Sequence, residues 1–311
     1  MTKIAIVTSF GGRFLELPRE LAGEEVVSIG RDEPFDAARG AEVAIGSNEP
    51  NRVRAVLDAL PTVRWYHSLG AGVERIVALE IAGRPGLVLT NNSGVYDAPI
   101  AEHVIATILA AAKQLHLRAR HQAAGEWVRE PNARDVRGST VVIVGMGSIG
   151  GEVGRLAKAL GMNVIGVRRS GADGSVTPDR LVEVASQADY FAICAALTPQ
   201  TRGLVSREVI AKLPAHAWVI NIARGAIADE PALLEAVREK RIGGAAIDAW
   251  WQEPLPADSP WWSLPNVIVT PHVSGESERF FERTLTLIRE NVRRFKAGEP
   301  LLNTVDLERG Y

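Results

Sequence analysis

The sequence predicts an α/β protein built from two doubly wound parallel-sheet domains. Short runs rich in Val, Ile and aromatic residues alternate with helical patterns along almost the whole chain, which is typical of βαβ units. The chain has 311 residues, a length that suits about two domains better than a single core. A glycine-rich stretch, "GMGSIG", lies near the middle of the chain, where a second βα series begins.

The first part of the chain alternates candidate strands with helix-like stretches such as 51–60. The expected strands are 3–9, 24–30, 41–47, 64–70 and 86–92. A long helical pattern then begins at Asp97, which can cap it, and Pro99 suits its first turn. About 25 residues without Gly or Pro follow, so we expect one continuous helix of roughly 37 Å, long enough to cross between two domains.

The second series contains six further candidate strands and ends in a long amphipathic stretch. The expected strands are 139–147, 162–167, 188–197, 217–223, 243–250 and 266–272. We expect the final helix, within 277–298, to pack back on the first domain. That domain would then be discontinuous, comprising 1–97 plus 276–311, and the other domain would be 98–275.

Composition excludes several classes of function. The net charge of -2, with basic residues spread along the chain, gives no basis for nucleic-acid binding. No run approaches the roughly 20 apolar residues of a membrane span, and the N-terminal apolar run is too short for a signal peptide. The single cysteine, Cys194, lies in an apolar run and is expected to be a buried core thiol. We therefore expect a cytoplasmic protein without a metal site.

The stretch 139–160 has the order of a dinucleotide-binding unit. Gly145, Gly147 and Gly150 lie directly between an apolar strand and a helix, and a second strand follows. In such a unit the first glycine allows the tight turn, the second the approach of a pyrophosphate, and the third close packing of helix on strand. The phosphate would lie at the helix N-terminus. The sequence therefore predicts a bound dinucleotide here.

The end of the second strand of this unit predicts which dinucleotide binds. An acidic residue there would hydrogen-bond the 2′-hydroxyl of NAD, but this chain has Arg168, Arg169 and Ser170. Two guanidinium groups and a hydroxyl attract a 2′-phosphate. We expect NADP(H) to be preferred. The alternative that these arginines are solvated surface charges leaves NAD(H) possible.

Three segments at the ends of later strands carry polar residues suited to one chemistry. They contribute Arg224, Glu253 and His272, and in an open α/β sheet such strand ends meet at one edge. Reducing a 2-oxo acid requires a cation for the carboxylate, a proton donor for the carbonyl oxygen and a partner for that donor. The planar guanidinium of Arg224 can bind the carboxylate with two hydrogen bonds, and His272 can donate a proton near neutral pH. Glu253 can accept a hydrogen bond from the other ring nitrogen of His272.

Taken together, these motifs resemble the D-isomer-specific 2-hydroxyacid dehydrogenase family. The residues that carry the resemblance are "GMGSIG", "LTPQTRGLVS", "NIARG", "AAIDAWWQEP" and "VTPHVSG", in the family's order and spacing over essentially the whole chain. Within the family, "HSLGAGVERI" and "NTVDLERGY" are most similar to the NADP-dependent glyoxylate/hydroxypyruvate reductases. The resemblance implies a Rossmann cofactor domain inserted into a flavodoxin-like substrate domain. The chain ends at Tyr311, so we expect no additional regulatory domain of the phosphoglycerate dehydrogenase kind.

The resemblance also implies roles for individual residues. Arg224, Glu253 and His272 match the catalytic residues, and Asp248 matches the acid that bonds the nicotinamide carboxamide. The implied cofactor-binding set is Gly145, Gly147, Ser148, Ile149, Gly150, Arg168, Arg169, Ser170, Thr198, Ala223 and Asp248. The implied substrate-binding set is Leu69, Gly70, Ala71, Gly72, Arg224 and His272, in which the backbone N–H groups of 69–72 hold the substrate carboxylate. The family forms homodimers through its cofactor domains, and Trp127 either reaches the neighbouring subunit or is a plain interface or core aromatic.

Two stretches depart from the family pattern. Ala195 and Ala196 replace a common Leu-Pro, and "NNSGVYDAP" replaces a common Asn-Thr-Pro form at the hinge. The leading interpretation is reduction of glyoxylate, hydroxypyruvate or a larger 2-oxo acid to the D-2-hydroxy acid. Two alternatives remain open: a dinucleotide-sensing binding protein on the same fold, and a dehydrogenase of another small anion.

Overall fold

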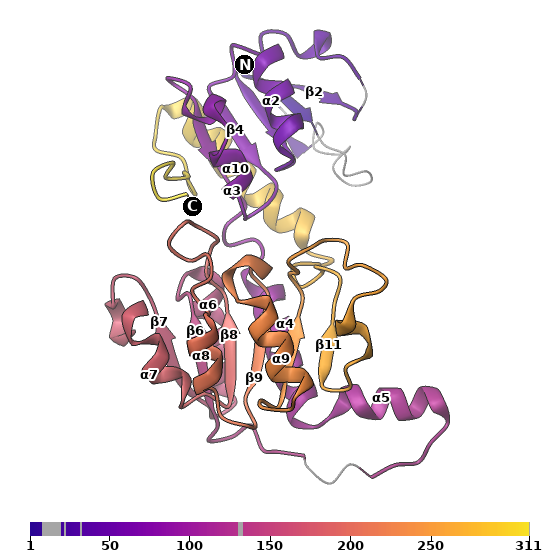
Figure 1. Ribbon diagram of the computed structural model, residues 1–311. Helices are drawn as coiled ribbons and strands as arrows, with labels where there is room; N and C mark the ends of the chain where they lie inside the picture. The colour runs from indigo at the N-terminus through magenta and orange to yellow at the C-terminus, as the bar shows by residue number, and fades with distance from the viewer. Residues whose placement is uncertain (8–19, 22, 32, 130–132, 311) are drawn as a thin grey trace. The chain divides into compact units, whose positions relative to one another are not determined.

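The computed structural model describes residues 1–7, 20–21, 23–31, 33–129 and 133–310, which form two compact units. Unit 1 comprises Met1–Tyr96 and Ser277–Tyr311, and unit 2 comprises Asp97–Glu276. The chain therefore enters unit 2 once and returns to unit 1 for its last helix, as Figure 1 shows by colour. The identification of unit 1 as a substrate domain and unit 2 as a cofactor domain remains a prediction.

Unit 1 contains a five-stranded parallel sheet in the order β2-β1-β3-β4-β5. Its strands are β1 (Lys3–Val7), β2 (Glu25–Ile29), β3 (Val43–Gly46), β4 (Trp65–Ser68) and β5 (Val88–Thr90). Its helices are α2 (Pro50–Ala59), α3 (Glu74–Val77) and α10 (Phe280–Ala297), with short 3-10 helices at Asp36–Ala38 and Glu80–Gly83. The expected first strand extended to residue 9, but positions 8 and 9 lie outside the described residues.

The alternation of side chains along β1 explains how both faces of this sheet are covered. Ala5 and Val7 pack in the cluster that includes α2, whereas Ile4 and Ile6 pack in the cluster that includes α10. Successive side chains of a strand point to opposite faces, so a strand buried on both faces is apolar throughout. The buried residues of α10 recur at helical spacing: Phe281, Leu285, Ile288 and Val292. The last helix thus packs on the first sheet, as expected.

Unit 2 contains a six-stranded parallel sheet in the order β11-β10-β9-β8-β6-β7. Its strands are β6 (Thr140–Val144), β7 (Asn163–Val167), β8 (Tyr190–Ile193), β9 (Trp218–Asn221), β10 (Gly244–Ile247) and β11 (Val267–Val269). Its α-helices are α4 (Asp97–Ala112), α5 (Leu115–Ala124), α6 (Ser148–Ala159), α7 (Leu181–Ala185), α8 (Arg207–Lys212) and α9 (Glu230–Arg238). Short 3-10 helices lie at Ala172–Gly174, Pro178–Arg180, Gly225–Ile227 and Pro260–Ser263.

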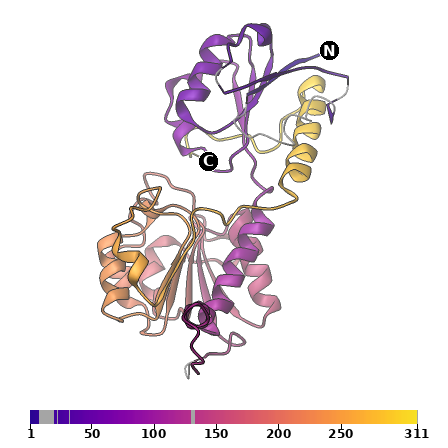
Figure 2. The same ribbon diagram turned by 90° about the vertical axis from the view of Figure 1, so that its right-hand side faces the viewer.

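Helices cover both faces of the unit 2 sheet (Figure 2). α4 packs against α6 on one face, and α7, α8 and α9 pack in a row over the other. The order of each sheet reverses once, between β1 and β3 in unit 1 and between β6 and β8 in unit 2. Open α/β sheets bind ligands at the carboxyl ends of their strands near such reversals. The two doubly wound parallel sheets confirm the predicted fold class.

The prediction of one continuous helix from Asp97 is wrong. It is divided into α4 and α5 at Gln114, whose backbone is left-handed with φ 55°. Eight residues of α4 are buried, whereas α5 has no buried residue. Tertiary packing therefore fixes α4 in the core of unit 2, whereas α5 lies on the surface of the unit. The break could not be predicted from the sequence, because neither Gly nor Pro marks it.

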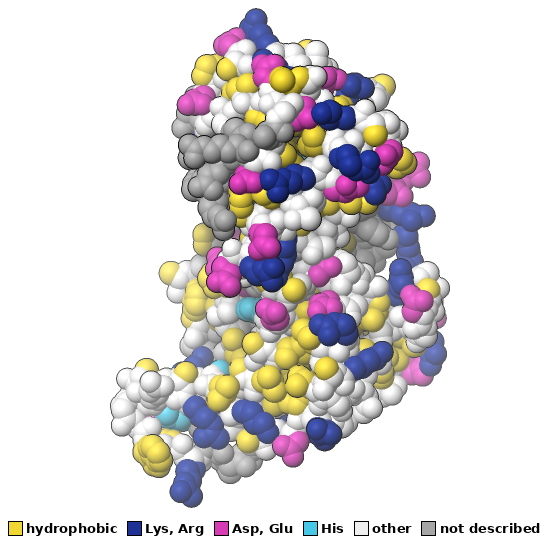
Figure 3. Space-filling view, turned by 180° about the vertical axis from the view of Figure 1, so that it is seen from behind, with side chains coloured by type: hydrophobic (Ala, Val, Ile, Leu, Met, Phe, Trp, Pro, Cys, Tyr) yellow, Lys and Arg dark blue, Asp and Glu magenta, His cyan; other side chains and the backbone are white. Residues whose placement is uncertain are grey.

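Within the described part of the chain, no helix is both long enough and apolar enough to cross a membrane. The face of the molecule in Figure 3 intersperses Lys and Arg with Asp and Glu side chains, in keeping with the small net charge. Basic side chains therefore form no continuous stripe on this face of the kind that binds nucleic acid.

Candidate active site

The glycine turn after β6 is fixed by backbone packing. Gly145 has φ 102°, and a Cβ there would lie 2.5 Å from the backbone nitrogen of Ala195. A Cβ on Gly150 would lie 2.0 Å from the carbonyl oxygen of Gly145. Gly147, the residue before α6, faces open space, where a side chain would obstruct a phosphate approaching the helix N-terminus. The turn therefore has the shape that a dinucleotide pyrophosphate requires.

The arginine pair lies beside this turn, at the carboxyl end of β7. The N–H of Gly145 donates to the carbonyl oxygen of Val167, directly before Arg168. The segment after β7 folds back so that Arg168 N donates to Val176 O at 2.8 Å. Arg168 also pairs with Asp173 at 2.8 Å, with both side chains largely in water. The strand end thus carries two arginines, and the guanidinium of Arg168 pairs with a carboxylate.

His272 and Glu253 form a close pair. The Nδ1 atom of His272 lies 2.9 Å from both carboxylate oxygens of Glu253, and Oε1 of Glu253 also accepts from Trp250 N at 2.9 Å. A carboxylate only accepts hydrogen bonds, so Nδ1 carries the hydrogen that bonds it. The Nε2 atom is consequently the ring position left to exchange a proton with a substrate. Arg224 follows β9, and its guanidinium donates to Ala223 O at 2.7 Å.

Asp248, at the end of β10, holds the turn that carries His272. Its Oδ1 accepts from Thr270 Oγ1 at 2.6 Å and from Val273 N at 2.9 Å, and its Oδ2 accepts from Ser274 N at 3.0 Å. Burial alone would raise the pKa of this carboxyl, but these hydrogen bonds hold the pKa below its ordinary value. His272 has a left-handed backbone with φ 56°, an uncommon conformation that the turn must maintain. Contact of Asp248 with a carboxamide remains a prediction.

Thr198 and Ala223, two further candidate residues of unit 2, lie in the segments after β8 and β9, while Ser148 and Ile149 begin α6 and Ser170 follows β7. Thr198 is buried, and its hydroxyl accepts from Thr201 N at 3.3 Å. Ala223 N donates to the Asn221 side chain at 3.1 Å. Cys194 is partly exposed, and burial of its sulfur raises the pKa of the thiol to about 12, so it is protonated and unreactive at neutral pH.

In unit 1, the turn Leu69–Gly72 follows β4 and is held by side chains. All four of its carbonyl groups accept hydrogen bonds. Leu69 O accepts from Asn92 and Tyr96, Gly70 O from Asn92 N, Ala71 O from Asn91 and Gly72 O from Asn48. Within the described part of the chain, the N–H groups of Ala71 and Gly72 donate to no protein acceptor. The turn therefore presents N–H groups and withdraws its carbonyls, an arrangement that favours an anion.

The sequence interpretation missed the side chains that hold this turn. Asn48, Asn91 and Asn92 follow the neighbouring strands β3 and β5, so all three lie at the same edge of the sheet as the turn. Asn48 also explains Gly70, since a Cβ there would lie 2.6 Å from the Asn48 amide nitrogen. The signal available in the sequence was an Asn within two residues of the end of each flanking strand.

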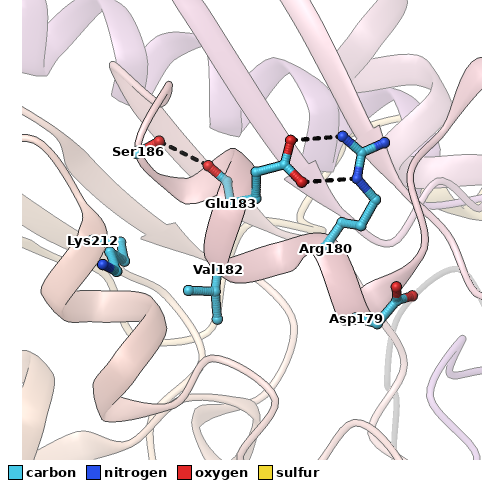
Figure 4. A pocket seen from close by; sticks show the side chains of 6 residues that line it. All are labelled: Asp179, Arg180, Val182, Glu183, Ser186 and Lys212. Atoms are coloured by element: carbon cyan, nitrogen blue, oxygen red, sulfur yellow. Dashed lines mark hydrogen bonds and ion pairs between the residues drawn. The ribbon is translucent and has the colours of Figure 1, made fainter.

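An open hollow elsewhere in unit 2 is not a comparable site. It has a volume of about 500 Å³ and is lined by Asp179, Arg180, Val182, Glu183, Ser186 and Lys212 (Figure 4). Arg180 and Glu183 satisfy each other through two hydrogen bonds of 2.9 and 2.7 Å. Among the described residues, no group of three or more His, Cys, Asp or Glu is arranged to hold a metal ion.

The chain is similar to known proteins over most of its length. Residues 105–274, more than half of the chain, match the family model of the D-isomer specific 2-hydroxyacid dehydrogenase NAD binding domain. D-3-phosphoglycerate dehydrogenase of Methanocaldococcus jannaschii is 30% identical over 99% of this chain, which spans 60% of that protein's length.

Two solved structures are similar over nearly all of both chains. A D-isomer specific 2-hydroxyacid dehydrogenase from Xanthobacter autotrophicus Py2, in complex with NADPH and MES, has a TM-score of 0.86, 28% identity and 99% coverage of each chain. An NADPH-dependent glyoxylate/hydroxypyruvate reductase from Sinorhizobium meliloti, in complex with NADP and sulfate, has a TM-score of 0.85, 27% identity and 100% coverage of each. The match to the family model over more than half of the chain shows that the chain belongs to the D-isomer specific 2-hydroxyacid dehydrogenase family.

Proposed function

We propose that this protein is an NADPH-dependent reductase that converts a 2-oxo acid to the D-2-hydroxy acid. The observation that carries the proposal is the His272–Glu253 pair, with Nδ1 held at 2.9 Å from both carboxylate oxygens. A pair of this kind serves a reaction in which one proton is delivered to a carbonyl oxygen. Glyoxylate, hydroxypyruvate and larger 2-oxo acids are the substrates in question.

Each named residue has a separate task in this reaction. Bound NADPH supplies the hydride. The N–H groups of Ala71 and Gly72 bind the substrate carboxylate, and Arg224 binds carboxylate and carbonyl oxygens with its planar fork. His272 donates a proton from Nε2 to the carbonyl oxygen, and Glu253 fixes the ring and stabilises its charged form.

The preference for NADPH rests on Arg168 and Arg169. They lie where the adenosine ribose is bound in a Rossmann unit, and a 2′-phosphate there would meet two guanidinium groups. Two of the similar solved structures contain NADPH or NADP, which supports this assignment. The roles of Ser148, Ile149 and Ser170 at the same turn belong to this proposal.

We also propose a homodimer formed through unit 2. No residue of α5 is buried, and Trp127, just after it, is 94% exposed in the single chain. Figure 1 shows α5 extending away from the sheet of unit 2. A second copy of the chain would cover these surfaces. Sedimentation of the wild-type protein should give twice the chain mass, and a monomer would contradict the proposal.

The first experiment is kcat/KM for NADPH and for NADH at saturating hydroxypyruvate. We expect a ratio above about ten in favour of NADPH, corresponding to about 1.4 kcal/mol. A preference for NADH would retain the reductase and overturn the role of the arginines. No turnover with hydroxypyruvate, glyoxylate or larger 2-oxo acids, together with tight NADPH binding, would instead favour a dinucleotide sensor.

A further inference from the structure

Asn92 connects three segments of unit 1 that are distant in sequence. Its side chain is fully buried, and its Oδ1 lies 3.0 Å from His67 Nε2. Its Nδ2 donates to Leu69 O at 2.9 Å and to Thr284 Oγ1 on α10 at 3.2 Å. The backbone N–H of Asn92 donates to Gly70 O at 3.2 Å. One residue thus fixes two consecutive carbonyls of the turn Leu69–Gly72.

The orientation of the Asn92 amide is determined by the Leu69 carbonyl, at one end of a buried chain of hydrogen bonds. At one end Leu69 O is a carbonyl and only accepts, so the amide must turn its NH₂ group toward it. At the other end Trp65 Nε1 only donates, and it bonds Thr90 Oγ1 at 2.8 Å. Thr90 then donates to His67 Nδ1 at 2.8 Å, and His67 Nε2–H donates to Asn92 Oδ1. Burial lowers the pKa of His67 to about 4, so at neutral pH the ring is neutral and its Nδ1 accepts from Thr90 while Nε2–H donates to Asn92.

The side chain at position 92 acts as both an acceptor and a donor, since Oδ1 lies 3.0 Å from His67 Nε2 and Nδ2 donates to Leu69 O. A Thr at 92 has a shorter side chain and no NH₂ group, so it would not bond Leu69 O and His67 together. Tyr96 adds a second donor to Leu69 O at 2.7 Å. Burial raises the pKa of Tyr96 to about 12, so this phenol keeps its proton at neutral pH.

We propose that Asn92 is the positioning residue of the substrate-binding turn, oriented by His67 behind it and assisted by Tyr96. The inference rests on the proposed function, in which the N–H groups of Ala71 and Gly72 bind the substrate carboxylate. By drawing the carbonyls of Leu69 and Gly70 into unit 1, Asn92 sets the direction in which the following N–H groups point. A displaced turn would weaken substrate binding and leave the proton donor and the cofactor turn of unit 2 intact.

The test compares Asn92→Ala with Asn291→Ala in the full-length protein. Asn291 is a matched control, because it is also fully buried in unit 1 and bonds Leu302 O and N, at 3.1 and 2.7 Å, without contacting the turn. Both variants should lose stability. We expect Asn92→Ala to raise the KM for hydroxypyruvate about tenfold. Its kcat and its KM for NADPH should stay within about threefold of the wild-type values. Asn291→Ala should leave all three constants within about twofold.

Hydrogen exchange gives a readout that does not depend on turnover. The amides of Ala71 and Gly72 should exchange faster in Asn92→Ala than in Asn291→Ala when the two variants are compared at equal global stability. If Asn92→Ala does not fold, Tyr96→Phe removes one donor to Leu69 O without leaving a cavity, and it should raise the KM about threefold.

The outcomes separate this inference from the proposed function. If the wild type turns over a 2-oxo acid and the Asn92 and Asn291 variants have the same KM for hydroxypyruvate, the positioning role is wrong and the proposed function stands. Unchanged constants in Tyr96→Phe would lead to the same conclusion where Asn92→Ala fails to fold. Absence of wild-type turnover with every 2-oxo acid overturns the proposed function, and the positioning role falls with it.

Discussion

The two candidate anion-binding turns of this protein are built in opposite ways. In unit 2 the turn 145–150 is shaped by backbone contacts that only glycine permits. In unit 1 the turn 69–72 is held by side chains from β4, β5 and the segments after β3 and β5. A backbone-shaped turn leaves a motif in the sequence, whereas a side-chain-held turn depends on residues scattered along the chain. The difference also predicts different responses to mutation and to pH.

The largest expected effect comes from removing the proton donor of unit 2. His272→Ala should lower kcat about a thousandfold, because general acid catalysis by one side chain accelerates a reaction by a factor of about this size. The affinity for NADPH should stay within about threefold of the wild-type value. The measurements are steady-state kinetics with hydroxypyruvate and a fluorescence titration of NADPH. Such a result would assign the chemistry to unit 2, in contrast to the KM effects expected in unit 1. Near-normal kcat would remove His272 from the role of donor.

The next effect tests whether backbone packing shapes the cofactor turn. Gly150→Ala would place a Cβ at 2.0 Å from Gly145 O, so the turn must shift. We expect the affinity for NADPH to fall about a hundredfold, or the free energy of unfolding to fall by about 3 kcal/mol. Gly151→Ala is the matched control, since a Cβ there meets open space, and it should be neutral or slightly stabilising. Equal behaviour of the two variants would contradict the packing argument.

Acid should destabilise the side-chain-held turn. Burial lowers the pKa of His67 from 6.5 to about 4, although the hydrogen bond to Asn92 opposes the shift. Between these values the unfolded chain binds a proton that the folded unit does not. The free energy of unfolding therefore falls as pH decreases from about 6.5 to about 4, by about 3 kcal/mol in total, and this contribution is constant above pH 7.

Urea unfolding at a series of pH values measures this contribution. His67→Gln cannot take up the proton, so the difference between wild type and variant isolates the histidine from the carboxylates that titrate in the same range. If the stability difference between wild type and variant does not change between pH 7 and pH 4, His67 has the same pKa in the folded and unfolded protein, which contradicts the effect of burial.

The smallest expected effect concerns the exposed arginines beside the glycine turn. Replacing Arg168 and Arg169 together by Ala should weaken NADPH binding about thirtyfold and NADH binding less than about threefold. The expected loss is moderate because Arg168 is partly in water and already pairs with Asp173. Dissociation constants for both cofactors at low and high salt provide the measurement. Equal losses would make the arginines general phosphate or folding residues.

The sequence by itself determined the features that depend on local pattern. Among the described residues, the eleven strands form where apolar, β-branched runs were expected, and Arg224, Asp248, Glu253 and His272 follow β9, β10 and β11. The glycine turn was visible because its geometry depends on residues within one short stretch. Residue type and spacing suffice for such features, since strand ends of a parallel sheet meet at one edge.

Only the tertiary structure decided the features that depend on distant partners. The expected single helix from Asp97 ends at Ala112, because packing of α4 within unit 2 outweighs the continuous helical pattern. The bonds from Asn48 and Asn92 to the turn 69–72 join residues more than twenty positions apart, and Thr284 lies 192 positions from Asn92. No local pattern encodes such hydrogen bonds, because an asparagine after a strand looks the same whether its amide meets water or a buried carbonyl.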